Sequence, residues 1–426
     1  MENCVQYQGL EGISCERVRH PSGLTFLFCP MPGYSSAYAL FATNYGSVDT
    51  SGITPEGKYF TIPDGTAHFL EHKLFEGKEG EDAFSLFAKT GASANAYTNF
   101  ENTAYLFSAS DHVQESAEIL MRFVTSPWFT EENVAKEQGI IGQEIRMYDD
   151  SPSWQVFFGM LTAMYVQNPV RTDIAGTVET IAQITPQTLY DCYSSYYNLN
   201  NMVYVIAGNF DRDGILAAAD RILPPAPAHQ VTRSVVEEPD LPGTREVEKS
   251  LPVALPLFHL GFKERPKEGK EAVRMSMMDE MIAEICCGEA SPLYRRLYDS
   301  GLINAEFGSE AFVGRGYRCN IFAGESREPK KVRDEILDEL ARLRREGIPQ
   351  ADFDRVKKQN YGRMIFGYNR VEGVASAALR GYFFGIEPFE EKTIAEGITL
   401  ADLQTQLEES FREECSVLSV ITPAGE

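Results

Sequence analysis

The sequence predicts an α+β protein built from two related domains, and three observations support this prediction. Short β-rich runs are separated by longer segments with helical periodicity. A stretch rich in proline and charge divides the 426 residues into two halves of similar size. Sequence features near the ends of the two halves recur in the same order. We therefore expect two similar arrangements of strands and helices rather than one large core.

The expected strands are short apolar runs, and the clearest ones in the first half cover residues 24–29, 37–43, 104–108 and 202–207. The dividing stretch covers residues 223–248, LPPAPAHQVTRSVVEEPDLPGTREVE, and has no sustained period. We predict domains at residues 1–222 and 249–426, joined by this linker.

The repetition between the halves involves three features. The motif T-I-A, followed by I-T and then leucine, begins at Thr180 and again at Thr393, an offset of 213 residues. A final apolar strand contains Val203 in the first half and Leu418 in the second, an offset of 215. A K-x-Q triplet within a helical run recurs at an offset of 221. Three matches in the same order indicate a duplicated domain rather than chance.

Composition and charge exclude several classes of protein. With 43% hydrophobic and 24% charged residues, the chain is expected to be globular over most of its length. The 62 Asp and Glu residues outnumber the 39 Lys and Arg residues, which gives a net charge of −23. This charge opposes binding to nucleic acid or to anionic lipid. The acidity either serves solubility alone or attracts basic ligands, and composition does not distinguish these alternatives.

Cysteine spacing and the amino terminus bear on location. The eight cysteines have no C-x-x-C pair and no regular spacing, so neither a zinc ribbon nor a disulfide framework is indicated. The first residues lack a basic region followed by an apolar stretch, and no run approaches 18 apolar residues. We expect a cytoplasmic protein without a membrane span.

Residues 64–77, DGTAHFLEHKLFEG, form the most informative local motif. Asp64 is a helix-start residue and Gly77 a stop, so a helix is predicted between them. At about 100° per residue, His68 and His72 lie roughly 40° apart, and Glu71 lies about 60° to the other side of His68.

Two imidazoles from successive turns can bind one divalent ion while the adjacent carboxylate acts as a general base. The order H-x-x-E-H is the inverse of the H-E-x-x-H zincin motif and occurs in metallopeptidases. The alternative is a pair of hydrogen-bonded histidines on a partly buried helix. Placing two of only six histidines one turn apart beside a glutamate argues against it.

A catalytic zinc ion needs a third protein ligand, and residues 130–150 are the candidate segment. Thr130 can cap a helix there. Glu137 and Glu144 are seven residues apart, so they share a face about 10 Å apart along the axis. One could bind metal and the other support it. From spacing alone, both could equally be solvated helix glutamates.

A family resemblance bears on this choice. H-F-L-E-H is followed after 71 residues by Glu144, and residues 91–98, GASANAYT, lead into E-N-T-A-Y at 101–105. These motifs resemble the zinc site and active-site strand of the pitrilysin/insulinase family of inverzincin metallopeptidases. The resemblance covers nearly the whole chain. It implies two homologous domains, each a mostly antiparallel sheet packed by helices, as in insulinase and mitochondrial processing peptidase.

The resemblance implies a zinc endopeptidase that hydrolyses peptides or unfolded polypeptides. Glu71 would be the general base, and Glu137 would support the site. One zinc ion per chain would bind His68, His72 and Glu144. Substrate would lie along the strand at Asn95, Ala96 and Thr98.

The second half departs from the family pattern. Its counterpart of the zinc helix, residues 279–287, contains no histidine. Active family members have an arginine and a tyrosine seven residues apart, whereas Leu297 and Asn304 stand at those positions here. A shift of one residue gives Arg296 and Ile303, again without the tyrosine.

The missing pair leads us to expect a homologous companion subunit or a homodimer. A chain that acts alone, slowly or on small peptides, is one alternative. A non-catalytic interaction or scaffold subunit of an insulinase-like complex is the other.

Overall fold

The computed structural model describes residues 4–9, 12–227, 229–234 and 236–424. The chain folds into two compact units. The first comprises Met1–Ile145, Asp173–Val235 and Ile365–Glu390. The second comprises Arg146–Thr172, Val236–Met364 and Glu391–Glu426. Each unit is described separately below.

A seven-stranded sheet in the order β1-β2-β3-β9-β4-β8-β7 is the centre of the first unit. All neighbouring strands are antiparallel except β3 and β9, which are parallel. Strand β7 lies at one edge of this sheet. The strands are β1 (Cys4–Gln8), β2 (Ser14–Arg19), β3 (Thr25–Pro30), β4 (Ala37–Thr43), β7 (Ser93–Thr98), β8 (Thr103–Ala109) and β9 (Met202–Gly208), and a separate hairpin pairs β5 (Ser51–Ile53) with β6 (Tyr59–Thr61).

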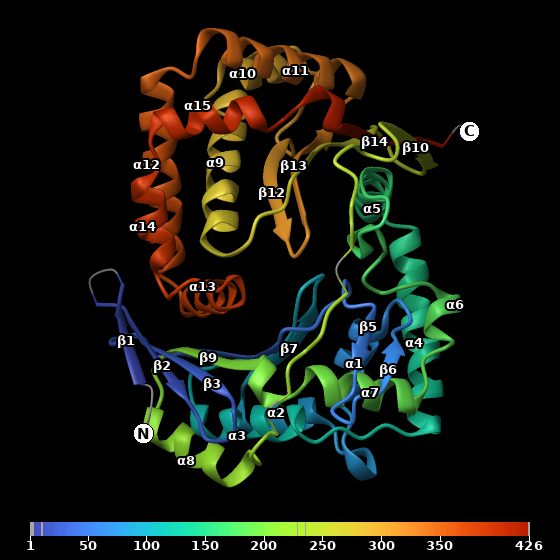
Figure 1. The fold of residues 1–426 in the computed structure, drawn as a ribbon, viewed down its shortest axis with the longest axis vertical. Helices are drawn as coiled ribbons and strands as arrows, with labels where there is room; N and C mark the ends of the chain where they lie inside the picture. The colour runs from blue at the N-terminus through green and yellow to red at the C-terminus, as the bar shows by residue number, and fades with distance from the viewer. Residues whose placement is uncertain (1–3, 10–11, 228, 235, 425–426) are drawn as a thin grey trace. The chain divides into compact units, whose positions relative to one another are not determined.

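Helices from both halves of the sequence pack in the first unit. Most come from the first half, but α13 (Val371–Phe384; labelled in Figure 1) comes from the second half and packs on β4 and β9. The others are α1 (Thr66–Leu74), α2 (Ala83–Thr90), α3 (Val113–Val124), α4 (Glu131–Asp149), α6 (Val178–Ile181), α7 (Pro186–Tyr196) and α8 (Arg212–Ile222), with α4 extending past the boundary of the unit.

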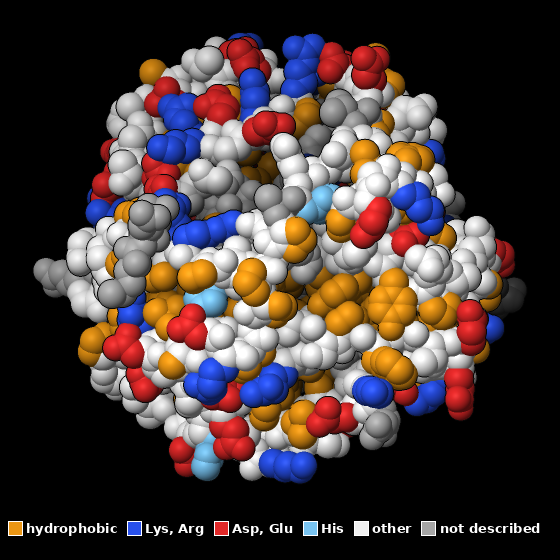
Figure 2. Space-filling model, turned by 60° about the horizontal axis from the view of Figure 1, so that its bottom comes forward, with side chains coloured by type: hydrophobic (Ala, Val, Ile, Leu, Met, Phe, Trp, Pro, Cys, Tyr) orange, Lys and Arg blue, Asp and Glu red, His pale blue; other side chains and the backbone are white. Residues whose placement is uncertain are grey.

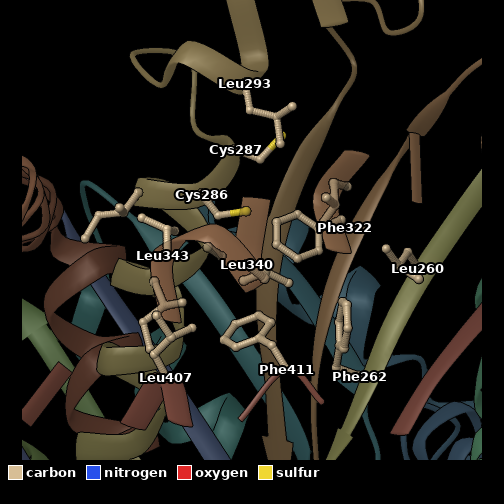
Figure 3. Packing of buried hydrophobic residues seen from close by; sticks show 14 of the residues in the cluster. Leu260, Phe262, Cys286, Cys287, Leu293, Phe322, Leu340, Leu343, Leu407 and Phe411 are labelled. Atoms are coloured by element: carbon tan, nitrogen blue, oxygen red, sulfur yellow. The ribbon is translucent and has the colours of Figure 1, made fainter. Parts of the chain in front are cut away.

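The second unit contains a five-stranded sheet in the order β10-β14-β11-β13-β12. Its strands are β10 (Glu246–Leu251), β11 (Leu257–Glu264), β12 (Gly308–Gly314), β13 (Tyr317–Glu325) and β14 (Ser416–Pro423). Its helices are α5 (Pro152–Met164), α9 (Gly269–Cys287), α10 (Pro292–Asp299), α11 (Pro329–Glu346), α12 (Gln350–Gly367), α14 (Glu390–Gly397) and α15 (Leu400–Glu409). Figure 3 shows the core between this sheet and its helices, where Phe262, Phe322 and Phe411 meet aliphatic side chains such as Leu340.

The two sheets have equivalent topologies. The order β3-β9-β4-β8-β7 in the first unit corresponds to β10-β14-β11-β13-β12 in the second. The first pair is parallel and the other three pairs are antiparallel in both sheets. The predicted α+β fold of two related, mostly antiparallel domains is confirmed.

The repeated motifs lie on equivalent elements of the two units. Val203 and Leu418 lie in the corresponding strands β9 and β14. The I-T repeat ends at Thr185 and Thr399, whose side chains cap α7 and α15 by accepting a hydrogen bond from the backbone three residues on. The repeat is therefore visible in the sequence because both copies need the same helix cap.

The compact units differ from the sequence-based domains by two exchanged segments. One of the passages between the units falls inside the expected linker, and β10 uses the last three linker residues. In addition, α5 from the first half packs on β10, β11 and β14 of the second unit, while α13 makes the reverse exchange. A single boundary in the sequence cannot describe such an exchange.

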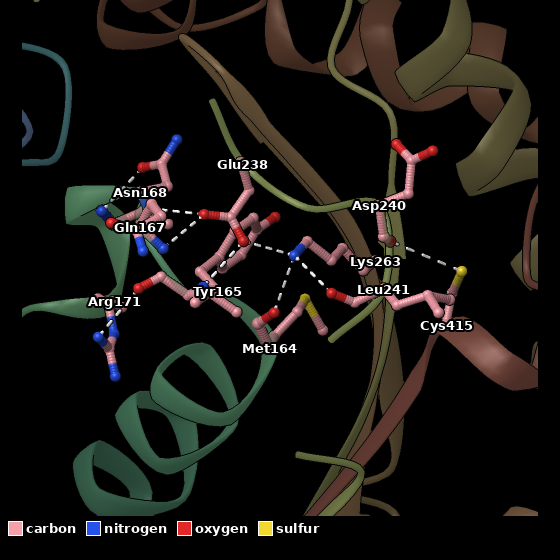
Figure 4. Close-up of polar contacts among 12 residues, drawn as sticks. Met164, Tyr165, Gln167, Asn168, Arg171, Glu238, Asp240, Leu241, Lys263 and Cys415 are labelled. Atoms are coloured by element: carbon pink, nitrogen blue, oxygen red, sulfur yellow. Dashed lines mark hydrogen bonds and ion pairs between the residues drawn. The ribbon is translucent and has the colours of Figure 1, made fainter. Parts of the chain in front are cut away.

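A buried carboxylate anchors the exchanged segment that contains α5 (Figure 4). Glu238 accepts hydrogen bonds from the backbone N–H groups of Val166, Gln167 and Asn168 at 2.7 to 2.8 Å. The same carboxylate pairs with Lys263 of β11, at an N–O distance of 2.5 Å. The turn after α5 is thus fixed by a group from the linker.

On the face shown in Figure 2, acidic and basic side chains are interspersed with apolar ones, and no broad basic area is visible. None of the helices in the described part of the chain is long and apolar enough to cross a membrane.

Candidate metal centre

Helix α1 carries the H-x-x-E-H motif and is almost completely buried. It begins at Thr66 after Gly65, whose φ of 89° lies in the left-handed region. A Cβ atom on Gly65 would lie 2.4 Å from the carbonyl oxygen of Ala175, so glycine is required by both conformation and space. Asp64 was predicted to start this helix, but the start is set by the glycine turn instead. Every α1 residue except His72 is buried.

Three ligand atoms converge beside α1, and their spacing fits a metal ion. The Nε2 atoms of His68 and His72 lie 3.7 and 3.6 Å from Oε2 of Glu144 on α4. All three atoms lie within 4.8 Å of one another. These separations exceed hydrogen-bond lengths but approach the edge of a zinc tetrahedron, about 3.3 Å for bonds of about 2.0 to 2.1 Å. Two imidazoles and one carboxylate are also a donor set that zinc accepts.

The two histidines have pKa values shifted in opposite directions. Burial, aided by the neighbouring His72, lowers the pKa of His68 to about 4. Burial also acts to lower the pKa of His72, but the hydrogen bond to Glu137 and the nearby carboxylates outweigh it, so that pKa is raised. At neutral pH, His68 therefore presents an uncharged imidazole, the form that binds a metal ion.

Glu71 lies in the motif helix and is held by the edge strand. Its side chain is buried, and burial raises the pKa of its carboxyl group. The hydroxyl of Thr98, at the end of β7, donates a hydrogen bond of 2.6 Å to Oε2 of Glu71. A raised pKa makes a carboxylate a better proton acceptor near neutral pH.

Glu137 contacts the side of His72 opposite to Glu144. Its Oε1 lies 3.1 Å from Nδ1 of His72. Burial opposes ionisation of Glu137, but His72 and Lys73 outweigh it and lower the pKa of this carboxyl group. Because a carboxylate only accepts, Nδ1 of His72 carries the hydrogen and Nε2 remains available as a ligand atom.

Helix α4 places both glutamates as the seven-residue spacing predicts. Thr130 caps this helix through its hydroxyl, which accepts from the backbone of Asn133 at 3.2 Å. The sequence did not identify Lys73, which contacts Glu137 at 3.4 Å. The one sequence feature that marks Lys73 is its position directly after His72.

Asn95 and Ala96 lie along β7. The side-chain oxygen of Asn95 accepts a hydrogen bond from the backbone N–H of Ala96. Side chains along this strand alternate between exposed and half-buried. Because β7 is an edge strand, its outer backbone N–H and C=O groups have no strand partner among the described residues.

Leu297 and Asn304 of the second unit make contacts within that unit. Leu297 of α10 is buried in the hydrophobic core. Asn304 donates a hydrogen bond to Glu325 of β13. Leu297 and Asn304, which stand where the resemblance implies the arginine and tyrosine, are therefore held in structural contacts of the second unit.

Comparisons with known proteins agree with the fold. A family model described as insulinase, peptidase family M16, matches residues 61–178. A second model, described as the peptidase M16 inactive domain, matches residues 183–360. The chain belongs to peptidase family M16.

Among its relatives is the uncharacterized zinc protease YmfH of Bacillus subtilis, 36% identical over 94% of this chain and 95% of the relative. The crystal structure of an M16-like peptidase from Alicyclobacillus acidocaldarius has a TM-score of 0.93 and 33% identity, covering 97% of this chain and 99% of the other. The periplasmic protease PqqL of Escherichia coli shares the fold at 17% identity, with a TM-score of 0.74. There 99% of this chain matches 48% of PqqL.

Proposed function

We propose that this chain is a zinc-dependent endopeptidase that hydrolyses peptides or unfolded polypeptides. One zinc ion would be held by His68, His72 and Glu144. The observation that carries the proposal is the convergence of these three ligand atoms within 4.8 Å, beside a buried glutamate on the same helix. When bound, zinc polarises a carbonyl group and makes water more acidic.

The chain's own residues would then perform the proton transfers. Glu71 accepts a proton from the attacking water and returns it to the departing amine. The Thr98 hydroxyl donates a hydrogen bond to Oε2 of Glu71 and so restricts the rotation of this carboxylate. The other oxygen, Oε1, is then left to accept the proton. Glu137 orients His72 through Nδ1.

Edge strand β7 is the proposed substrate site. An extended peptide could add as a further strand and gain main-chain hydrogen bonds that do not depend on its side chains. Asn95 and Ala96 would contact this peptide, and Thr98 would connect the strand to Glu71. Such binding suits unfolded polypeptides because a folded protein does not offer a free extended segment.

We also propose a homologous companion subunit. No arginine of the chain is followed seven residues later by a tyrosine, so neither this chain nor a second copy of it offers the family's pair. PqqL supports the idea, because a chain of this length corresponds to about half of it. We place the complex in the cytoplasm, which is consistent with eight cysteines that form no disulfide bond.

The test of catalysis is metal analysis of the purified chain together with the Glu71→Gln variant. We expect one zinc per chain in both proteins, and loss of cleavage of a quenched peptide by at least about 100-fold in the variant. Absence of bound zinc from the wild type, or full activity of the variant, would refute the proposal.

The test of the companion subunit is addition of a purified homologous chain that carries the arginine and tyrosine. We expect cleavage to rise only on mixing, and a variant companion lacking the tyrosine to give no rise. A non-catalytic scaffold role is the second candidate, favoured by the missing pair. It predicts a complex with the companion but no cleavage under any condition.

A further inference from the structure

Lys73 is a completely buried charge next to the candidate metal centre. It follows His72 in α1, and its side chain is 0% exposed. A buried ammonium group is stable only when it is paired. Two carboxylates pair with it: Glu76, three residues further on, at 2.5 Å, and Glu137 at 3.4 Å.

Glu137 is shared between Lys73 and His72. Oε2 faces the Lys73 ammonium group, and Oε1 faces Nδ1 of His72 at 3.1 Å. The two partners are consecutive residues of α1, whereas Glu137 reaches them from α4. A carboxylate held at both oxygens has one orientation, and that orientation directs Nε2 of His72 toward Glu144.

We infer that Lys73 is a positioning residue for the metal centre: it holds the Glu137 carboxylate against His72 and so sets the direction of the His72 ligand atom. The inference rests on the proposed zinc site. Without the ammonium group, the buried Glu137 carboxylate loses the cation at Oε2 and can rotate away from Nδ1. His72 would then lose the partner that fixes its ring and its tautomer.

The measurement is the zinc affinity of the full-length chain, determined by competition with a chromogenic chelator. Lys73→Met keeps the length of the side chain and removes its charge. Loss of a group that orients a metal-bound histidine lowers affinity by about 10- to 100-fold. Because Lys73 contacts Glu137 rather than His72 itself, we expect zinc affinity to fall by about tenfold, the lower end of this range.

A double-mutant cycle with Glu137→Gln tests whether Lys73 acts through Glu137. In the Glu137→Gln background, Lys73→Met should change zinc affinity by less than about threefold. Glu76→Gln is the matched control, because it removes the other partner of Lys73 and leaves the Glu137–His72 contact intact. It should change the affinity by less than about threefold.

Several results would overturn the inference. These are unchanged zinc affinity in Lys73→Met, an equal effect of Lys73→Met on both backgrounds, and an equal loss in Glu76→Gln. A role in folding alone would lower the unfolding midpoint of the metal-free protein without changing zinc affinity. If Lys73→Met does not fold, Lys73→Gln replaces it in the cycle. If the wild type binds no zinc, the proposed function fails instead.

Discussion

Glu238 offers the strongest prediction about stability, because four donors converge on its carboxylate (Figure 4). Three are backbone N–H groups of the turn after α5, and the fourth is the Lys263 ammonium group. The Glu238 and Lys263 side chains are only 9% and 3% exposed. Glu238→Gln keeps the shape but leaves one carbonyl oxygen, with two lone pairs, for four donors.

The expected loss follows from this inventory. At least two donors lose their acceptor, and hydrogen bonds to charged groups contribute about 1.5 to 3 kcal/mol each. Breaking a buried ion pair by changing one partner costs about 3 to 5 kcal/mol. Both routes predict that Glu238→Gln lowers the free energy of unfolding of the second unit by about 3 to 5 kcal/mol.

The assay uses the two tryptophans of the chain, one in each unit. Trp154 lies in α5 and belongs to the second unit, whereas Trp128 belongs to the first. In a Trp128→Phe background, the fluorescence of Trp154 reports urea unfolding of the second unit. Exposed Glu237 provides the matched control, and Glu237→Gln should change stability by less than about 0.5 kcal/mol. Equal midpoints for the two variants would refute the reasoning.

Two further predictions concern pH and a glycine. Burial, reinforced by Asp279, raises the pKa of Glu264 to about 8. The folded chain therefore holds a proton that the unfolded chain releases near pH 4.5, so stability should fall as pH rises from about 4.5 to 8. Glu264→Gln should flatten this slope in the Trp154 assay, and an unchanged slope would contradict the assignment. Gly65→Ala should destabilise the first unit by about 3 kcal/mol or more, because a clash with Ala175 adds to the strain of a positive φ. Gly91→Ala has the same strain without a clash and should cost about 1 to 2 kcal/mol, and equal losses by Trp128 fluorescence would show that the clash is relieved.

Local patterns in the sequence predicted four strands of the first sheet and proposed the central residues of the candidate site. The run 37–43 coincides with β4, and the other three predicted strands match β3, β8 and β9 to within one residue at each end. Helical periodicity placed His68, Glu71 and His72 on one face, and the seven-residue spacing placed Glu137 and Glu144 together on α4. These features depend on backbone geometry that repeats over a few residues, so a single segment contains the information.

Contacts between distant segments could not be predicted in this way. Lys73 looks like an ordinary helix lysine, and its burial depends on Glu137, which approaches from another helix. Thr98 was expected to meet substrate, but its contact with Glu71 depends on where the end of β7 packs against α1. The residues that support a site from other segments are determined by packing, which the spacing within one segment does not describe.

The sequence by itself determined the duplicated α+β fold, because both copies retain the same strand patterns and the same threonine helix caps. It also named His68 and His72 as candidate metal ligands, while the choice of Glu144 over Glu137 rested on the family resemblance. Only the tertiary structure decided that α5 and α13 are exchanged between the units. The physical reason is that the two sheets share a five-strand topology, so an apolar helix from either half can pack on either sheet. The choice then depends on contacts far away in the chain, such as those of Glu238 with the turn after α5.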